Sequence, residues 1–261
     1  MQPFELVRPT SAAEAAAAFR GDAAYLAGGH TLIPAMKAGL RAVERLIDLG
    51  TVPGLDGIGL ADGRLWIGAM ARHAAVAASP VVRRAIPGLA RLAGGIGDPQ
   101  VRARGTLGGS VANNDPAADY PAAVLALDAV IETDRGVHAA EDFFQGMFAT
   151  ALAEGEIITR VGFRLAEAFA YAKFPHPASR YALAGVAVAR LPDGVRVAVT
   201  GATLGVVRWP EAEAAIATGA PLPRALDHPD LASDLHAGAD YRAHLAGVML
   251  ARAARAIASG A

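Results

Sequence analysis

The chain of 261 residues contains no cysteine, which limits the ways in which it can fold. Without thiols it cannot be a disulfide-stapled scaffold, bind zinc through thiolates, hold an iron–sulfur cluster or use a cysteine nucleophile. Its fold must rest on a buried apolar core, and the length predicts one large or two modest domains with such a core. Hydrophobic residues supply 53% of the chain but aromatic residues only 6%, because much of the apolar share is alanine.

The charge balance and the hydropathy pattern bear on possible partners. The chain has 24 basic and 25 acidic residues, so no basic excess is present to neutralise a nucleic-acid backbone. No run of about 18 strongly apolar residues predicts a transmembrane segment. The first ten residues lack the basic start and apolar centre of a signal peptide. We therefore expect a cytoplasmic protein with no nucleic-acid partner.

The pattern of elements changes near residues 166–175, where we expect a domain boundary. In the first part, strands are predicted at 4–7, 24–27, 45–49, 58–60, 64–67, 129–133, 137–139 and 156–165, with helices at 12–20, 32–38, 71–78, 80–93 and around 118–127. In the second part, long apolar strands at 181–191 and 195–204 join through Pro192-Asp193-Gly194, followed by a strand at 205–209 and helices at 210–217 and 241–258.

A first glycine-rich loop extends from Ala27 to Ile33, between a predicted strand and a short predicted helix. Gly28 and Gly29 allow a positive φ and a close approach of a ligand to the backbone. The free N–H groups at the start of the following helix favour an anion, and the Thr31 hydroxyl can add a hydrogen bond. The same residues also fit a simple turn. They match neither the P-loop nor the G-x-G-x-x-G fingerprint.

A second glycine-rich loop lies within residues 105–121 and is rich in small donors: GTLGGSVANNDPAADYP. Near its end Asp119 precedes a predicted helix, so it either caps that helix or accepts hydrogen bonds from ribose hydroxyls or an adenine amine. The two loops are roughly 75 residues apart, and together they suit a long ligand with a central pyrophosphate, such as a dinucleotide.

Six blocks carry a resemblance over essentially the whole chain: AGGHTLIPAMK, GDPQVRARGTLGGSVANNDPAADYPAA, FFQGMF, GEIIT, KFPHPASRYAL and SDLHAGADYRAHL. The chain resembles the FAD-binding medium subunit of molybdenum hydroxylases, of the carbon monoxide dehydrogenase and xanthine dehydrogenase type. The resemblance implies an α+β fold with a two-part FAD-binding domain of the vanillyl-alcohol-oxidase (PCMH) type over residues 1–170. Its subdomains would be about 1–55 and 56–170, and a smaller antiparallel sheet-plus-helix domain would occupy 171–261.

The resemblance also implies the residues that bind FAD. They are Ala27, Gly28, Gly29, His30, Thr31, Leu32 and Ile33 in the first loop, Thr106, Gly108, Gly109, Ser110, Ala112, Asn113 and Asp119 in the second, and Ile157, Ile158 and Lys173 beyond it. No catalytic side chain is expected, because the flavin carries the redox chemistry. Lys173 and Tyr181 are candidate tuning residues: Lys173 as a cation near the flavin pyrimidine edge, and Tyr181 near the isoalloxazine or packed in the core.

Other candidates for chemistry are less specific. His30 has either a role beside the flavin or that of a polar turn residue. Arg102 and Arg104 either neutralise phosphate or form surface salt bridges. His236 and His244 lack the companion carboxylates of a zinc site, so we expect no metal in this chain.

The function implied by the resemblance is that of an oxidoreductase subunit that transfers electrons. A large partner would bind the molybdenum–pterin cofactor, and a small partner would carry 2Fe–2S clusters that pass electrons to the FAD of this chain. The acceptor would be a quinone, NAD or oxygen, and the complex a dimer of heterotrimers. A stand-alone flavin reductase of the same broad fold and a non-redox scaffold subunit remain as alternatives.

Overall fold

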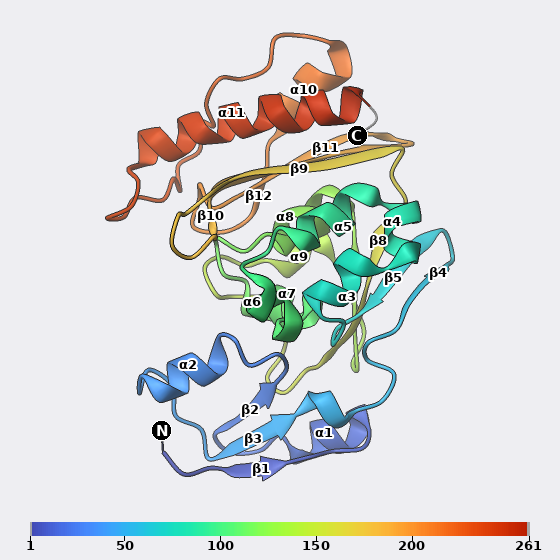
Figure 1. Ribbon diagram of the computed structural model, residues 1–261, viewed down its shortest axis with the longest axis vertical. Coiled ribbons are helices and arrows are strands. Elements are labelled where there is room, and N and C mark those ends of the chain that lie inside the picture. Colours follow the sequence, from blue (N-terminus) through green and yellow to red (C-terminus); the bar gives the residue numbers. More distant parts are fainter. Residues whose placement is uncertain (1, 260–261) are drawn as a thin grey trace.

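Three sheets of different construction follow one another along the chain in the computed structural model, which describes residues 2–259 (Figure 1). The first is a small parallel sheet, the second is a five-stranded antiparallel sheet with helices packed against it, and the third is a four-stranded antiparallel sheet. The α+β class implied by the resemblance is therefore confirmed.

The first sheet has the strand order β1-β3-β2, formed by Glu5–Val7, Arg45–Asp48 and Ala23–Leu26. Its parallel strands require crossovers, which are supplied by α1 (Ala12–Ala18) and α2 (Leu32–Lys37). Ser11 caps α1: its Oγ accepts from the Glu14 N–H at 3.1 Å, while the Glu14 carboxylate accepts from the Thr10 N–H, one residue before the cap, at 2.7 Å. A 3-10 turn at Leu49–Thr51 follows β3.

The second sheet has the order β4-β5-β8-β6-β7, and every neighbouring pair in it is antiparallel. Its strands are Ile58–Ala61, Arg64–Gly68, Ile158–Arg164, Val130–Thr133 and Val137–Ala139. The helices between them are α3 (His73–Ala78), α4 (Pro80–Ala85), α5 (Pro87–Gly94), α6 (Pro99–Arg104), α7 (Leu107–Asn113), α8 (Tyr120–Ala126) and α9 (Ala140–Phe143). Apolar side chains of the inner strands, such as Ile67 and Phe163, share one core with Leu89 and Leu107 from these helices.

The third sheet has the order β12-β11-β10-β9, formed by Val207–Arg208, Gly194–Thr200, Ala182–Leu191 and Ala168–Pro175. Both of its faces are buried. Ala187 and Ala189 of β10 belong to the core of the second sheet, whereas Val186 and Val188 belong to a separate core with α10 (Pro210–Thr218) and α11 (Ala239–Ala258). Because alternate residues of a strand point to opposite faces, burial of both faces gives β10 its nearly continuous apolar sequence.

Three sequence predictions differ from the structure between residues 80 and 175. The second glycine-rich segment is predicted as a loop but contains α7, which Thr106 caps through its side-chain oxygen, and α6, capped by Asp98 in the same way, lies directly before it. Strand β9 lies in the interval where only a boundary is predicted, since its alternating alanines carry a weak strand signal. The predicted helix 80–93 is also divided, because Pro87 starts a new helix.

Candidate functional site

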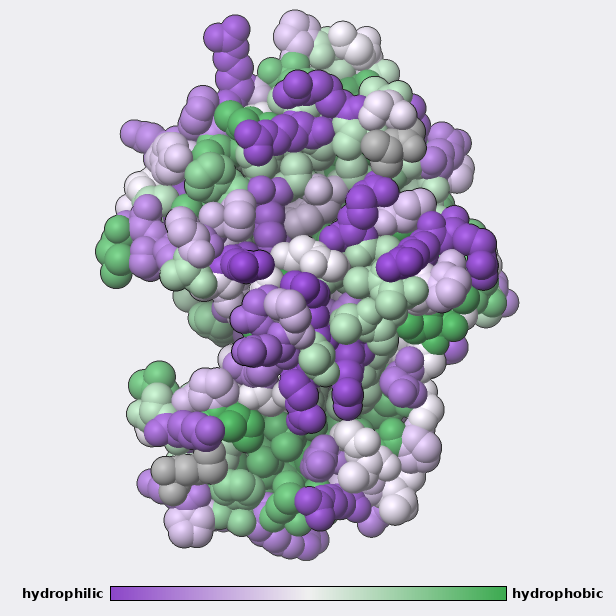
Figure 2. Space-filling view, viewed as in Figure 1, coloured by the Kyte–Doolittle hydropathy of each residue, from purple (hydrophilic) through white to green (hydrophobic). Residues whose placement is uncertain are grey.

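A cavity of about 1100 Å³ lies between the first sheet and the helices of the second, and Figure 2 shows the molecule hollowed at this level. Most of its wall comes from three separate parts of the chain: the segment from Ala24 to Arg41, the segment from Ile96 to Asp119, and the turn Ser179–Tyr181 beside the third sheet. The rest of the lining comes from residues between Phe148 and Ile158 and from Leu49, Ala69, Met70 and His73. The fold thus brings the two glycine-rich segments to one place.

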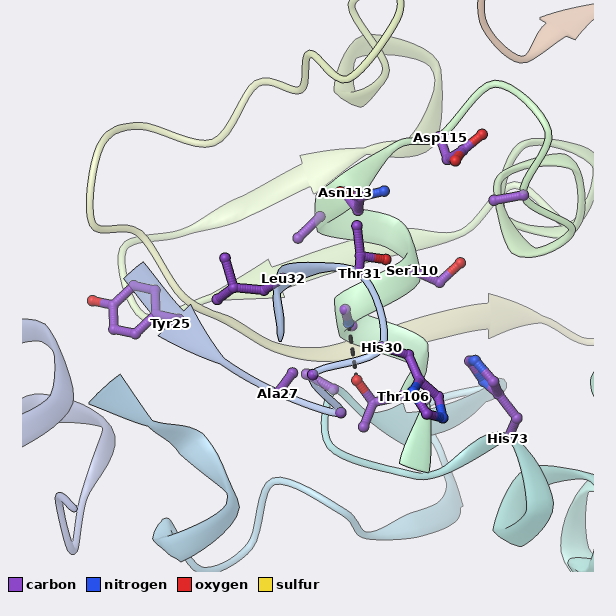
Figure 3. Close-up of a pocket in the computed structure, with 18 of the residues that line it drawn as sticks. Tyr25, Ala27, His30, Thr31, Leu32, His73, Thr106, Ser110, Asn113 and Asp115 are labelled. Atoms are coloured by element: carbon purple, nitrogen blue, oxygen red, sulfur yellow. Dashed lines mark hydrogen bonds between the residues drawn. The ribbon is translucent and has the colours of Figure 1, made fainter. Parts of the chain in front are cut away.

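Most of the residues predicted to bind FAD line this cavity. They are Ala27, Gly28, Gly29, His30, Thr31, Leu32, Thr106, Gly108, Gly109, Ser110, Ala112, Asn113, Asp119, Ile157 and Ile158. Figure 3 shows Thr31 and Leu32 of the first loop near α7, which carries Ser110 and Asn113. Ile33 and Lys173, the other two predicted residues, are not part of the lining.

The first loop offers a row of unused backbone donors. Within residues 2–259, the N–H groups of residues 28–32 donate no hydrogen bond, whereas the N–H of Ile33 already returns to Gly29 O at 3.1 Å. Gly29 has φ +75°, a value that L side chains rarely adopt. A Cβ on Gly28 would collide with the carbonyl oxygen of Arg104, so the loop rests directly on the second glycine-rich segment. Unpaired N–H groups of this kind favour an anionic ligand.

The second segment is built differently. The N–H groups at the start of α7 are already paired: Leu107 donates to Ala71 O, Gly108 to Ala69 O, and Gly109 to Thr106 Oγ1 at 3.1 Å (Figure 3). The first loop therefore has free N–H groups for an anion, whereas the first N–H groups of α7 are already used within the protein. A Cβ on Gly108 would lie 2.5 Å from that of Ala69, so this glycine lets the helix pack closely on the neighbouring chain.

Asp119 does not cap α8, although capping is one of its two predicted roles. Its side chain makes no capping hydrogen bond. Instead, its buried carboxylate accepts from the Tyr171 hydroxyl at 2.5 Å and forms an ion pair with Lys173 Nζ at 2.9 Å. Burial raises the pKa of Asp119, and the nearby Lys173 charge opposes this rise. Both carboxylate oxygens are thus engaged by side chains of β9.

Lys173 lies behind the cavity wall. Its side chain is only 12% exposed, and Nζ also donates to the carbonyl oxygen of Arg180 at 3.0 Å. Arg180 has φ +62° and lines the cavity together with Tyr181. Tyr181 is 43% exposed, which rules out the alternative that it packs in the core.

The remaining candidates have other partners. His30 Nε2 lies 3.1 Å from Gln100 O, and the Arg102 guanidinium donates to the carbonyl oxygens of Ile96 and Gly97 rather than forming a salt bridge. His236 pairs with His176 at 3.2 Å. In the part of the chain that the structure describes, no group of three or more metal-binding side chains is present.

Several cavity residues carry no signal in the sequence. Tyr25, His73, Asp115 and Phe148 all line the cavity, and the Tyr25 hydroxyl donates to Gly155 O at 2.9 Å. Asp115 and Phe148 lie in quoted blocks but are not predicted as site residues, and the place of Phe148 in the wall depends on a loop with φ +55° at this residue. The others reach the cavity through tertiary packing, which local patterns do not encode.

The residues of the cavity fit a bound FAD. Ligand cavities usually measure roughly 300–1000 Å³, so a volume near 1100 Å³ is large enough for a dinucleotide. The unpaired N–H groups of the first loop suit a pyrophosphate, and the glycines leave the loop backbone open to it. Apolar residues such as Ile157 and Leu152 can cover planar rings.

Comparisons with known proteins identify the class. Residues 2–163 match the family model described as "FAD binding domain in molybdopterin dehydrogenase". The chain is 34% identical to the carbon monoxide dehydrogenase medium chain of Hydrogenophaga pseudoflava over 276 residues, covering 97% of this chain and 96% of that one. It is 35% identical to the nicotine 6-hydroxylase medium subunit of Paenarthrobacter nicotinovorans, covering 85% and 84%.

Solved structures of related enzymes are similar to this chain over nearly its whole length. A carbon monoxide dehydrogenase structure from Oligotropha carboxidovorans superposes with a TM-score of 0.90 at 32% identity, covering 100% of this chain and 99% of that one. Quinoline 2-oxidoreductase of Pseudomonas putida 86 gives 0.87 at 26% identity, covering 99% and 98%. The chain belongs to the family of FAD-binding medium subunits of molybdopterin dehydrogenases, which are oxidoreductases. Between residues 2 and 259, no helix combines the length and apolarity needed to cross a membrane.

Proposed function

We propose that this chain is the electron-transfer subunit of a molybdenum-containing hydroxylase or dehydrogenase. In this role it receives electrons from a partner subunit that carries 2Fe–2S clusters and passes them to an external acceptor such as a quinone, NAD or oxygen. The observation that carries the proposal is the cavity itself, in which both glycine-rich segments of a matched FAD-binding domain meet. Bound FAD supplies the one- and two-electron chemistry that such a relay requires.

The partners follow from what the chain lacks and from its relatives. With no cysteine, it has no thiolates for an iron–sulfur cluster, so the clusters must lie on another chain. The relatives are named medium chains and medium subunits, which supports assembly with a large molybdopterin-binding subunit and a small 2Fe–2S subunit. We propose a dimer of heterotrimers, with residues 1–170 as the FAD-binding domain and 171–261 as the C-terminal domain.

Different residues of the cavity bind different parts of the cofactor. The N–H groups of the first loop bind the pyrophosphate, while Ser110 and Asn113 on α7 contact the ribose and phosphate oxygens. Tyr181 lies against the flavin rings, and Lys173 places a positive charge behind the Arg180 carbonyl. A positive charge close to the flavin stabilises its reduced, anionic form and so tunes its potential. Asp119 acts mainly by holding Lys173 in place.

A glycine substitution in the cavity wall tests FAD binding. Gly109 lines the cavity in α7, and a Cβ there would lie 2.8 Å from Thr106 Oγ1 and 3.5 Å from the Ala27 Cβ, in the gap between the two segments. We expect Gly109→Val to abolish the flavin absorbance of the purified full-length chain. The matched control is Gly94→Val in α5, where the new Cβ meets only the Ala77 Cβ at 3.7 Å.

Two outcomes would contradict the proposal. A wild-type chain that binds no FAD on reconstitution, or a Gly109→Val chain that retains it stoichiometrically, would show that the cavity is not the FAD site. In the reconstituted complex, substrate should bleach the flavin absorbance only when the 2Fe–2S subunit is present. Oxidation of NADPH by the isolated chain would instead favour the stand-alone flavin reductase.

A further inference from the structure

His73 lies where the two glycine-rich segments meet, and the site described above gives it no role. It is the first residue of α3, its side chain is 5% exposed, and it lines the cavity beside His30 (Figure 3). Its backbone N–H donates to Gly105 O at 2.9 Å. A Cβ on Gly105 would lie 2.6 Å from His73 Nε2, so the ring rests directly on this glycine.

Gly105 also lies against the first loop. A Cβ on Gly28 would lie 2.8 Å from the Gly105 Cα, so His73, Gly105 and Gly28 form a close stack. The unpaired N–H groups of the first loop begin at Gly28. A ligand oxygen bound by the start of that loop would therefore lie in the part of the cavity that the His73 ring lines.

The two ring nitrogens of His73 have different surroundings. Nδ1 is enclosed by protein and has no hydrogen-bond partner among the described residues. Nε2 also has no partner within that part of the chain, but it is not enclosed, so it is the nitrogen that a ligand in the cavity can reach. A buried N–H without an acceptor costs about 1–3 kcal/mol, which favours the tautomer with its proton on Nε2. Burial, with the nearby charges of His30 and Arg102, lowers the pKa of His73 to about 4, so the ring stays neutral.

We propose that His73 is a cofactor-binding residue whose Nε2–H donates a hydrogen bond to an oxygen of the sugar–phosphate part of FAD. This inference rests on the proposed function, because it requires FAD in the cavity. It adds a donor from α3 to the row of backbone donors in the first loop. The role is binding only: no proton is transferred and no bond is made or broken.

Two substitutions distinguish the ring nitrogens. A glutamine amide can replace Nε2–H in position, whereas an asparagine amide reaches only as far as Nδ1. In the full-length chain we expect His73→Asn to raise the dissociation constant of FAD about 10- to 100-fold, the range for a hydrogen bond to a charged acceptor. His73→Gln should stay within about threefold of wild type. The FAD titration is followed by flavin absorbance and fluorescence, and the melting temperature of each FAD-free variant is measured alongside.

Tyr120→Phe serves as a control, because it changes a buried polar group that packs against the His73 ring. The Tyr120 ring centroid lies 5.4 Å from that of His73, and its hydroxyl is also buried without a partner in the described residues, but it does not line the cavity. Its removal should leave FAD affinity unchanged. Equal FAD affinities for the asparagine and glutamine variants would overturn the inference, as would losses of affinity that simply follow the melting temperatures. If wild type binds no FAD, the proposed function fails and the inference fails with it.

Discussion

His73 makes the stability of the FAD-free chain depend on pH in a defined window. Its pKa is about 4 in the folded chain, against about 6.5 in the unfolded chain. Below pH 6.5 the unfolded chain therefore binds more protons than the folded one, so stability falls as the pH is lowered toward 4. We expect the free energy of unfolding to fall by about 2 kcal/mol between pH 7 and pH 5 from this residue alone.

The glutamine variant isolates that contribution. Glutamine does not titrate, so the His73→Gln chain should have a flatter stability profile between pH 7 and pH 5, measured by urea unfolding without FAD. Glu156, whose pKa is lowered to about 2 by His138, Thr133 and Ala153 against the effect of burial, affects stability only at lower pH. Parallel profiles for wild type and variant would mean that the imidazole is solvated rather than buried.

At the scale of elements, Asn114 clamps the loop that carries Phe148. Its side-chain amide donates to Gly146 O at 2.8 Å and to Ala149 O at 2.7 Å, and its own carbonyl accepts from the Phe148 N–H at 3.1 Å. Asn114 itself ends α7 with φ +42°. The clamp thus ties the helix of the second glycine-rich segment to the loop Gly146–Ala149.

Two substitutions distinguish the effect of losing the Asn114 side-chain hydrogen bonds from the effect of backbone strain at this position. Asn114→Ala and Asn114→Gly both remove the amide, so both should increase proteolysis of residues 144–150 and hydrogen exchange at the Phe148 amide. Only alanine must also adopt a left-handed conformation, and we expect its chain to be about 1 kcal/mol less stable than the glycine variant. The free energies come from denaturant unfolding. Protection at Phe148 as high as in wild type would show that the loop holds its conformation without the clamp.

Helices and strands whose signals lie close together in the sequence could be predicted, and those that depend on distant residues could not. The predicted helix at 12–20 and the predicted hairpin at Pro192-Asp193-Gly194 correspond to α1 and to the pair β10–β11, because the Ser11 cap and the turn residues act within a few positions of the elements that they define. The helical state of α7 is missed because its two glycines are poor helix formers, and the Thr106 cap and packing on Ala69 compensate. The ion pair of Asp119 with Lys173 joins residues 54 positions apart, so no local pattern could have shown it.

At the scale of the whole molecule, the cavity joins parts of the chain that have separate cores. The first sheet packs its own apolar clusters, whereas α7 belongs to the core of the second sheet, and the turn at Arg180 lies beside the third. Since residues from all three parts line the cavity, a dinucleotide that fills it would touch all three. It therefore adds contacts between units that otherwise meet through loops such as the one at Gly28.

FAD should accordingly stabilise the folded chain more than FMN, which corresponds to the flavin half of FAD. At a free concentration about 100 times its dissociation constant, a ligand adds about 2.7 kcal/mol of stability, or about 5–10 °C in melting temperature for a chain of this size. FMN lacks the adenylate half and so loses the contacts made by that half. At equal concentration it should raise the melting temperature by only a small part of the FAD shift. Calorimetry of the apoprotein with each ligand measures both shifts, and Gly109→Val serves as the control that responds to neither. Equal shifts with FMN and FAD would mean that the flavin end alone occupies the cavity, in which case the two glycine-rich segments do not share one dinucleotide.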